Sequence, residues 1–161
     1  MSITKDEMLS KPAQSQETAA KFQKFLIFMI RDTETADLKL GVDVAYVVDI
    51  LDSYELTYLP MVPDYVRGVF NLRGQIIPAM DMRSRLGKPS IEEGLLIVLD
   101  YNGIQLGIIV DAVDRIIDID ESEITTVRSQ ESQRFVSGMC TIPDQSGTLL
   151  VLNCEQLFAH E

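Results

Sequence analysis

The chain alternates short apolar runs with polar turns, which is typical of an antiparallel β protein. Residues Phe25–Ile30 form a compact apolar run, and a polar segment at Asp32–Asp37 separates it from a second run at Leu38–Val42. This spacing predicts a β-hairpin. Apolar positions then recur every three residues, which predicts a short helical turn leading into another strand, at Val44, Val47 and Ile50.

The second half of the chain repeats this plan. Runs at Leu95–Leu99 and Leu106–Ile108 flank Asn102-Gly103, and Asn-Gly is the strongest short signal for a hairpin turn. Three later segments match segments of the first half in the same order: Glu123–Thr125 matches Glu55–Thr57, Phe135–Met139 matches Tyr65–Val69, and Leu149–Asn153 matches Ile77–Asp81. We infer a diverged internal duplication.

Each repeat contains about five short strands, and so few residues bury a poor core on their own. Two small β-barrels that share apolar surface would solve this problem. We therefore expect one mainly β domain with short helices over residues 25–161, with a first barrel unit at about 25–86 and a second at about 95–158. The pattern leaves open how the units exchange strands. Residues 1–24 lack a steady apolar face, and we expect a mostly disordered lead-in, with a weak helix around 14–24 as the alternative.

The stretch Val66–Gly87 carries the most specific order of residues. Two apolar strands flank the polar segment Asn71–Gly74, and a turn of helix follows them. Gly74 between apolar runs suggests a β-bulge or a close backbone approach. Pro78 has no backbone donor, so we expect it at a sheet edge or where its strand ends.

Composition and charge exclude several classes of function. The 161 residues carry 25 acidic and 14 basic side chains, a net charge of −11. A nucleic-acid interface needs a basic stripe, so we expect no nucleic-acid partner. The same charge disfavours an anionic membrane surface, and no apolar run reaches the roughly 18 residues of a membrane-spanning helix.

We expect no enzyme, no cofactor and no metal. The sequence contains neither a G-x-S-x-G nucleophile elbow nor a phosphate-binding loop, and its one histidine, His160, is the penultimate residue. Cys140 and Cys154 lie among apolar neighbours, which suits reduced, buried thiols in a cytoplasmic protein. A structural zinc site uses four cysteine or histidine ligands, and the chain has only two cysteines and one histidine, so we expect no zinc site of this kind.

The order of residues within Val66–Gly87 resembles the signature of the CheW family, the coupling proteins of bacterial chemosensory arrays. The matching residues are Gly68, Val69, Asn71, Leu72, Arg73, Gly74, Ile76, Pro78, Asp81 and Arg83. The resemblance implies a pair of five-stranded SH3-like β-barrels, which agrees with the duplication. It covers nearly all of the chain from Phe25 onward.

The resemblance also implies partner-binding residues. In this family the arginine at the position of Arg73 is thought to face an acidic residue in the strand after the first hairpin, where this chain has Asp49. We expect Arg73 to be partly desolvated beside Leu72 and Ile76. Two roles stay open for the pair, a salt bridge that holds the barrel and a contact with a partner. The further partner-binding residues that we expect are Val47, Ile50, Gly68, Asn71, Leu95 and Val113, although core packing is the alternative for each apolar one.

The interpretation that follows is a non-catalytic adaptor. The resemblance implies that it links the cytoplasmic tip of a methyl-accepting chemoreceptor to the regulatory domain of a CheA-type histidine kinase, with other CheW-like proteins as further partners. It implies a cytoplasmic protein associated with receptor arrays at the inner membrane. The alternatives are a coupling protein of a type IV pilus or other non-flagellar chemosensory system, or a ligand-binding small β-barrel protein.

Overall fold

The computed structural model describes residues 20–32, 36–90, 93–128, 134–144 and 146–159. The elements are strands β1 (Phe22–Ile30), β2 (Leu38–Asp43), β3 (Val47–Leu51), β4 (Val66–Leu72), β5 (Gln75–Asp81), β6 (Leu95–Tyr101), β7 (Ile104–Val110), β8 (Ala112–Asp120), β9 (Thr125–Thr126), β10 (Val136–Thr141) and β11 (Thr148–Leu152), the 3-10 turns η1 (Val44–Tyr46) and η2 (Glu121–Glu123), and the helices α3 (Met82–Arg85) and α4 (Cys154–Phe158). The mainly β prediction is confirmed.

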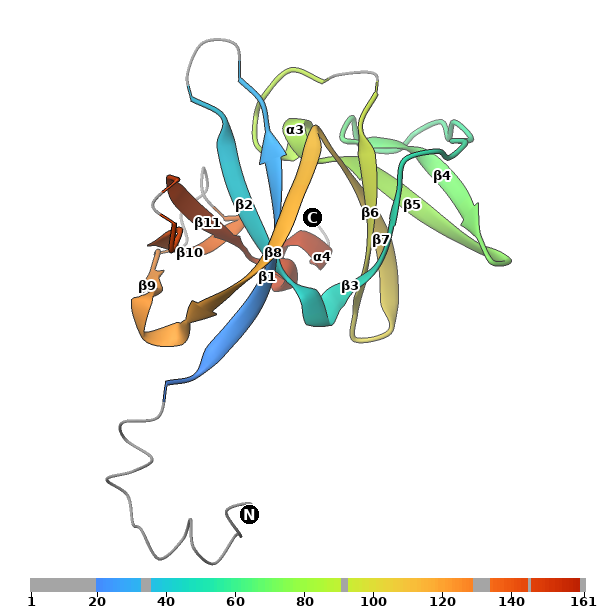
Figure 1. Cartoon of the computed structure of the whole chain (residues 1–161). Helices are drawn as coiled ribbons and strands as arrows, with labels where there is room; N and C mark the ends of the chain where they lie inside the picture. Colours follow the sequence, from blue (N-terminus) through green and yellow to red (C-terminus); the bar gives the residue numbers. More distant parts are fainter. Residues whose placement is uncertain (1–19, 33–35, 91–92, 129–133, 145, 160–161) are drawn as a thin grey trace, which may run out of the picture.

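The strands form two sheets that lie side by side (Figure 1). The first sheet, sheet A, has the order β8-β1-β2-β11-β10-β9, and the second, sheet B, has the order β3-β6-β7-β5-β4. The extra strand of sheet A is the two-residue β9, which pairs with β10. Its equivalent in sheet B is a single bridge between Thr57 and Val69. The two sheets are therefore built to one plan.

The two barrels do not correspond to the sequence units 25–86 and 95–158. The first hairpin, β1–β2, pairs with β8 and β11 of the second half, and the second hairpin, β6–β7, pairs with β3 and β5 of the first half. Each repeat thus gives its opening hairpin to the other. The parallel pairs that join the exchanged strands keep equivalent registers, with Val151 opposite Gly41 in sheet A and Ala79 opposite Gly107 in sheet B.

The exchange explains why the strands of these hairpins are apolar on both faces. In β1, Phe25 and Ile27 point into a cluster within sheet A, whereas Leu26 and Phe28 point into the largest cluster, which lies between the sheets. In β6 the alternation is the same, with Leu96 and Val98 in a cluster of sheet B and Ile97 and Leu99 in the central one. A strand buried on both faces shows a continuous apolar run rather than an alternating one.

The beginning of the fold differs from the sequence prediction. Strand β1 starts at Phe22, three residues inside the expected lead-in, and its first residues pair with Ile119 and Asp120 of β8. A helix that reaches Lys24 is therefore wrong for residues 22–24, because partners far away in the sequence hold them extended. Residues 20 and 21 lie in neither a helix nor a strand, and residues 1–19 of the predicted lead-in lie outside the described residues.

Candidate functional site

The turn between β4 and β5 presents Arg73 at the tip of a hairpin. Arg73 and Gly74 both have positive φ, 52° and 88°, as a two-residue type I′ turn requires. The Asn71 side chain accepts a hydrogen bond from the Gly74 N–H at 3.1 Å, which holds the turn closed. A Cβ atom at Gly74 would meet nothing within 4 Å, so the predicted bulge or close approach is wrong there. Glycine is used for its backbone conformation alone.

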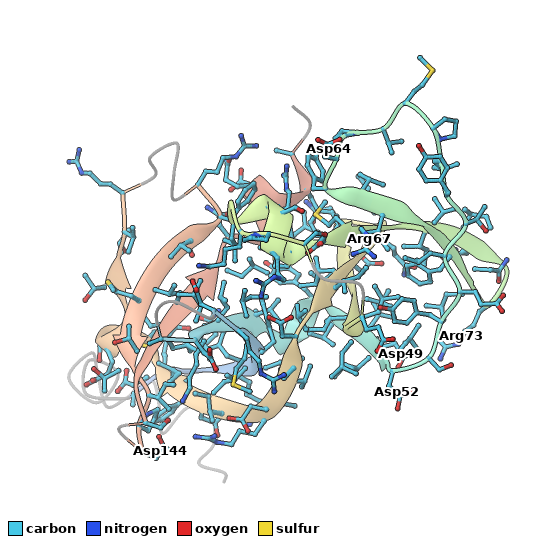
Figure 2. All side chains as sticks on the ribbon, turned by 90° about the horizontal axis from the view of Figure 1, so that it is seen from above. Asp49, Asp52, Asp64, Arg67, Arg73 and Asp144 are labelled. Carbon is cyan, nitrogen blue, oxygen red and sulfur yellow. The ribbon has the colours of Figure 1, made fainter. Side chains whose placement is uncertain are left out.

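Arg73 reaches back from this turn to strand β3. Its Nη2 lies 3.4 Å from Oδ2 of Asp49, so the predicted ion pair is present (Figure 2). The expected desolvation is wrong: the Arg73 side chain is 73% exposed and the Asp49 side chain 30% exposed. The hairpin tip lies outside the part of β5 that pairs with β7, because this ladder begins only at Ala79 opposite Gly107. An exposed pair of this kind contributes about 0–1 kcal/mol to stability.

Gly68 is needed by the fold. It is buried in β4 at a register shift, with φ of 147°, and a Cβ atom there would lie 2.5 Å from the carbonyl oxygen of Thr57. That close approach carries the bridge in which Thr57 and Val69 exchange two backbone hydrogen bonds, at 2.8 and 2.9 Å. The close approach predicted for Gly74 is therefore found at Gly68.

The other apolar residues of the predicted set divide by exposure. Val47, Leu95 and Val113 are half-buried and pack against the central cluster, whereas Ile50 is 40% exposed. Val47, Asp49 and Ile50 lie on β3 of sheet B beside β6, and Val113 lies on β8 of sheet A. Leu95 lines a hollow of about 660 Å³ together with Asp52, Ser53, Tyr54, Leu56, Glu93, Gly94 and Asp111. The structure thus places Val47, Asp49 and Ile50 on one strand beside β6 and joins Asp49 to Arg73, whereas Gly68 and Asn71 lie on β4 and Val113 lies on the other sheet.

Sequence reasoning named Arg83 as a motif residue without a role, and the structure supplies one. Its side chain is 10% exposed, and its Nη1 donates to Oδ2 of Asp111 at 2.8 Å and to the carbonyl of Arg31 at 2.5 Å. Its Nε donates to the carbonyl of Pro89 at 2.6 Å. Arg83 therefore joins α3, the end of β1 and the connection from β7 to β8. In the sequence, the only signal for Arg83 was its place two residues after Asp81 in the motif.

Asp81 begins α3 next to this network. One of its carboxylate oxygens accepts the N–H of Arg83 at 2.9 Å as an N-terminal cap, and the other pairs with Arg67 at 3.4 Å and accepts the hydroxyl of Ser90. Asp81 is 1% exposed. These partners account for its burial, because a buried carboxylate needs hydrogen bonds and a counter-charge.

The second repeat carries an ion pair at the equivalent place with the charges exchanged. Arg115 lies on β8, which is equivalent to β3, and pairs with Asp144 in the loop between β10 and β11. Figure 2 shows Asp144 at the far end of the molecule from Asp49 and Arg73. The first repeat therefore has an acid on the strand and a base on the turn, and the second repeat has the reverse.

The remaining chemistry-bearing groups suit structural roles. Burial raises the pKa of the Cys154 thiol to about 12 and also raises the pKa of Cys140, so both stay protonated at neutral pH. Over the ranges that the structure describes, no cluster of three or more His, Cys, Asp or Glu side chains could hold a metal ion. Within the same ranges, no helix is long and apolar enough to span a membrane.

Comparisons with known proteins place the chain in one family. The model of the CheW-like domain matches residues 24–161. The chemotaxis protein CheW of Klebsiella aerogenes is 31% identical over 145 residues, which cover 86% of this chain and 83% of that protein. The chemotaxis protein CheW of Bacillus subtilis is 36% identical over 105 residues, which cover 63% of this chain and 64% of that protein.

A solved structure agrees with these sequences. The scaffolding protein TtCheW from Thermoanaerobacter tengcongensis superposes with a TM-score of 0.72 at 27% identity, covering 83% of this chain and 90% of that one. The fold, the internal repeat and the motif from Gly68 to Arg83 therefore have one explanation. The chain belongs to the CheW family and is a non-catalytic scaffold of chemotaxis signalling.

Proposed function

We propose that this chain couples the cytoplasmic tips of chemoreceptors to the regulatory domain of a CheA-type histidine kinase, and that Arg73 is its principal contact residue. In this proposal the protein works in the cytoplasm, in receptor arrays at the inner membrane. It acts by position: one surface holds a kinase near another that holds a receptor. The observation that carries the proposal is the choice of arginine at residue 73.

Arginine is a poor residue for the backbone conformation found there. Outside glycine, asparagine and aspartate adopt positive φ most readily. The hairpin between β6 and β7 has the same turn, with Asn102 at φ 54° and Gly103 at φ 87°. Asp100 closes that turn as Asn71 closes the other, by accepting the Gly103 N–H at 3.0 Å. The same turn thus uses the preferred asparagine in one hairpin and arginine in the other.

The gain in stability from Arg73 does not explain this choice. Its ion pair with Asp49 is exposed and long at 3.4 Å, and such pairs contribute little. Residues that break a local preference without a structural gain tend to lie at functional sites. Arg73 is also a suitable residue for an interface, because its planar guanidinium can bind a partner's carboxylate through two hydrogen bonds.

The surroundings of Arg73 suit a protein partner. Ile50, 40% exposed, lies next to Asp49, and Ile76, 64% exposed, lies beside the turn on β5. A small apolar patch with charged groups at its rim is typical of exchangeable protein contacts. We include Val47, Asp49, Gly68, Asn71, Leu95 and Val113 in the proposed binding surfaces on the strength of the family resemblance, with other CheW-like proteins as further partners.

The test exchanges the residues of the two turns. Arg73→Asn introduces the residue of the equivalent turn, so we expect folding to be kept while binding to the kinase or the receptor falls at least tenfold. The matched control is Asn102→Arg, which places an arginine in the same backbone conformation on the other hairpin. It should leave binding unchanged.

Binding is measured by co-sedimentation of the purified chain with receptor fragments and a CheA-type kinase, and each partner is also titrated alone. Unfolding in urea checks that both variants are folded. Undiminished binding of Arg73→Asn to both partners would remove the role proposed for Arg73. Failure of the unmodified chain to bind either partner would contradict the coupling function itself.

A further inference from the structure

The tips of the two hairpins in sheet B, β4–β5 and β6–β7, diverge (Figure 1), and residues of both hairpins line a groove there. The groove has a volume of about 450 Å³, and its walls are formed by Gln75, Ile76 and Ile77 of β5 and by Asp100, Gly103 and Gln105 of the β6–β7 hairpin. We propose that this groove binds an extended peptide segment of a partner protein by β-strand pairing. The proposal goes beyond the coupling function and does not depend on it.

Pro78 causes the divergence. Strands β5 and β7 pair in parallel only from Ala79 opposite Gly107 to Asp81 opposite Ile109. In sheet A the equivalent strands β11 and β2 begin to pair two residues earlier, with Leu149 opposite Lys39 and Leu150 opposite Leu40. The residue equivalent to Leu150 is Pro78, which has no N–H to donate to a neighbouring strand.

The orientation of Pro78 shows that the missing donor would have faced β7. Pro78 lies opposite Val69 of β4, and the N–H and C=O of Val69 both bond to Thr57 on the other side. Val69 and Pro78 are therefore a non-hydrogen-bonded pair of the antiparallel ladder, in which each residue points its backbone groups away from the other strand. By the same alternation, the backbone groups of Ile76 also point away from β4, toward the groove.

The opposite wall presents a matching edge. Gln105 lies opposite Asp100 of β6, one residue after the pair that flanks the two-residue turn, so its backbone groups also point away from β6. Ile76 and Gln105 thus turn N–H and C=O groups toward one groove from two sides. A strand that enters the groove could pair with both edges, which is the mode of recognition called β-augmentation.

In sheet A a side chain crosses the equivalent gap, beside a hollow of about 460 Å³ that the same segments line. Lys39, which is equivalent to Gln105, donates from Nζ to the carbonyl of Ser146 across the gap at 3.0 Å. Gln105 instead donates to Asp100 of its own hairpin at 3.2 Å. Sheet B therefore combines two differences, a proline that shortens the ladder and a glutamine that does not bridge it.

The walls indicate the chemistry of the segment that would fit. Asp100 accepts hydrogen bonds from Gly103 and Gln105, and a carboxylate has capacity for more, so a lysine or arginine can bind there. Ile76 is 64% exposed and Ile104, at the neighbouring tip, is 59% exposed. At about 3.3 Å per strand residue, the wall residues accommodate a segment of roughly three to five residues. We therefore expect alternating apolar and basic side chains.

The probe is the synthetic peptide acetyl-Val-Lys-Val-Lys-Val-amide, titrated into the full chain labelled with ¹⁵N. We expect shifts concentrated at the backbone amides of Ile76 and Gln105. A control peptide with the same side chains and a methylated backbone lacks the donors and should bind at least tenfold more weakly. Shifts confined to another sheet edge, equal binding of the methylated peptide, or no shifts at millimolar peptide would overturn the proposal.

Two variants obstruct strand pairing in the groove in different ways, one by extending the β5–β7 ladder and one by placing a lysine across the gap. Pro78→Leu introduces the leucine of the equivalent position 150, and Gln105→Lys introduces the lysine of the equivalent position 39. Either should weaken peptide binding at least tenfold, and Gln105→Lys keeps the test decisive if the proline variant does not fold. Undiminished binding to a folded Gln105→Lys chain would contradict the proposal.

Two further measurements test whether the groove binds something other than a partner's peptide. Shifts of the Ile76 and Gln105 amides that depend on protein concentration without peptide would assign the groove to a second copy of the chain. Peptide binding that appears only after removal of residues 1–16 would assign it to the chain's own N-terminal segment. Either result would overturn the assignment to a partner's peptide.

Discussion

Two exposed ion pairs, Asp49–Arg73 and Arg115–Asp144, occupy equivalent places with opposite charges. In each repeat one charge lies on an edge strand and the other in the connection of the hairpin toward the opposite edge of the same sheet. The fold therefore accepts either sign at both positions. Because the fold does not require a particular charge at these positions, the charge can serve recognition. A partner that binds an arginine on the turn would distinguish the two ends of a nearly symmetric molecule.

The helices that end the two repeats differ in a similar way. Both begin with a side-chain cap, from Asp81 in α3 and from Asn153 in α4. Two residues after the cap, the first repeat has the buried Arg83 and the second has the exposed Glu155. The first repeat thus uses this position to join three segments, whereas the second leaves it in solvent. Duplicated positions need not have duplicated roles.

The largest expected loss of stability comes from substituting Arg83, and it tests the difference between the buried Arg83 and the exposed Glu155. Arg83→Met removes the counter-charge of Asp111, whose side chain is only 3% exposed, and leaves a buried carboxylate with only the backbone N–H of Arg31 as a donor among the described residues. We expect the free energy of unfolding in urea to fall by about 3–5 kcal/mol. The matched change Glu155→Gln should alter it by less than about 0.5 kcal/mol, since the side chain is exposed. Equal losses for the two variants would contradict the division of roles.

A smaller effect is expected from the glycines at the equivalent register shifts of β4 and β10. Gly68→Ala places a Cβ atom 2.5 Å from the backbone oxygen of Thr57 at φ 147°, and we expect a loss of about 2–3 kcal/mol. At Gly138 the nearest atom is Cγ2 of the Ile124 side chain at 2.8 Å, and the nearest backbone atom, the Thr125 oxygen, is farther away at 3.1 Å, so Gly138→Ala should cost about 1 kcal/mol. Chemical denaturation of both variants measures the difference, and a reversed order would contradict it.

The smallest effect concerns the acid of the second ion pair. The pKa of the Asp144 carboxyl lies below its ordinary value, because the side chain and backbone N–H of Ser146 hydrogen-bond to it and because Arg115 and Lys39 lie near. The ionised form therefore favours folding above the unfolded pKa, and this contribution disappears as the pH falls through the lower folded pKa. NMR titration should show that Ser146→Ala raises this pKa more than Arg115→Gln does. The opposite order would make the ion pair the main cause.

The local signals in the sequence predicted local structure well. The hairpin at Asn102-Gly103, the helical turn before β3 and the equivalence of the two repeats are all found in the structure. Each depends on residues within a few positions of one another, such as the preference of Asn-Gly for positive φ. Gly74 was harder to interpret, because a glycine between apolar runs fits both a bulge and a turn. Only the pairing of Leu72 with Gln75 distinguishes them.

The sequence by itself determined the strands, the repeat and the family, because periodicity and turn residues act over short distances. The tertiary structure alone decided which strands pair. The two opening hairpins have the same pattern and pair in equivalent registers, so their local sequence does not show which repeat each one joins. The exposure of Arg73 and the burial of Arg83 were decided in the same way. Both arginines lie near apolar residues in the sequence, but Arg73 is on a hairpin tip beyond the end of the β5–β7 ladder, whereas Arg83 is held between the residue after β1 and the β7–β8 connection.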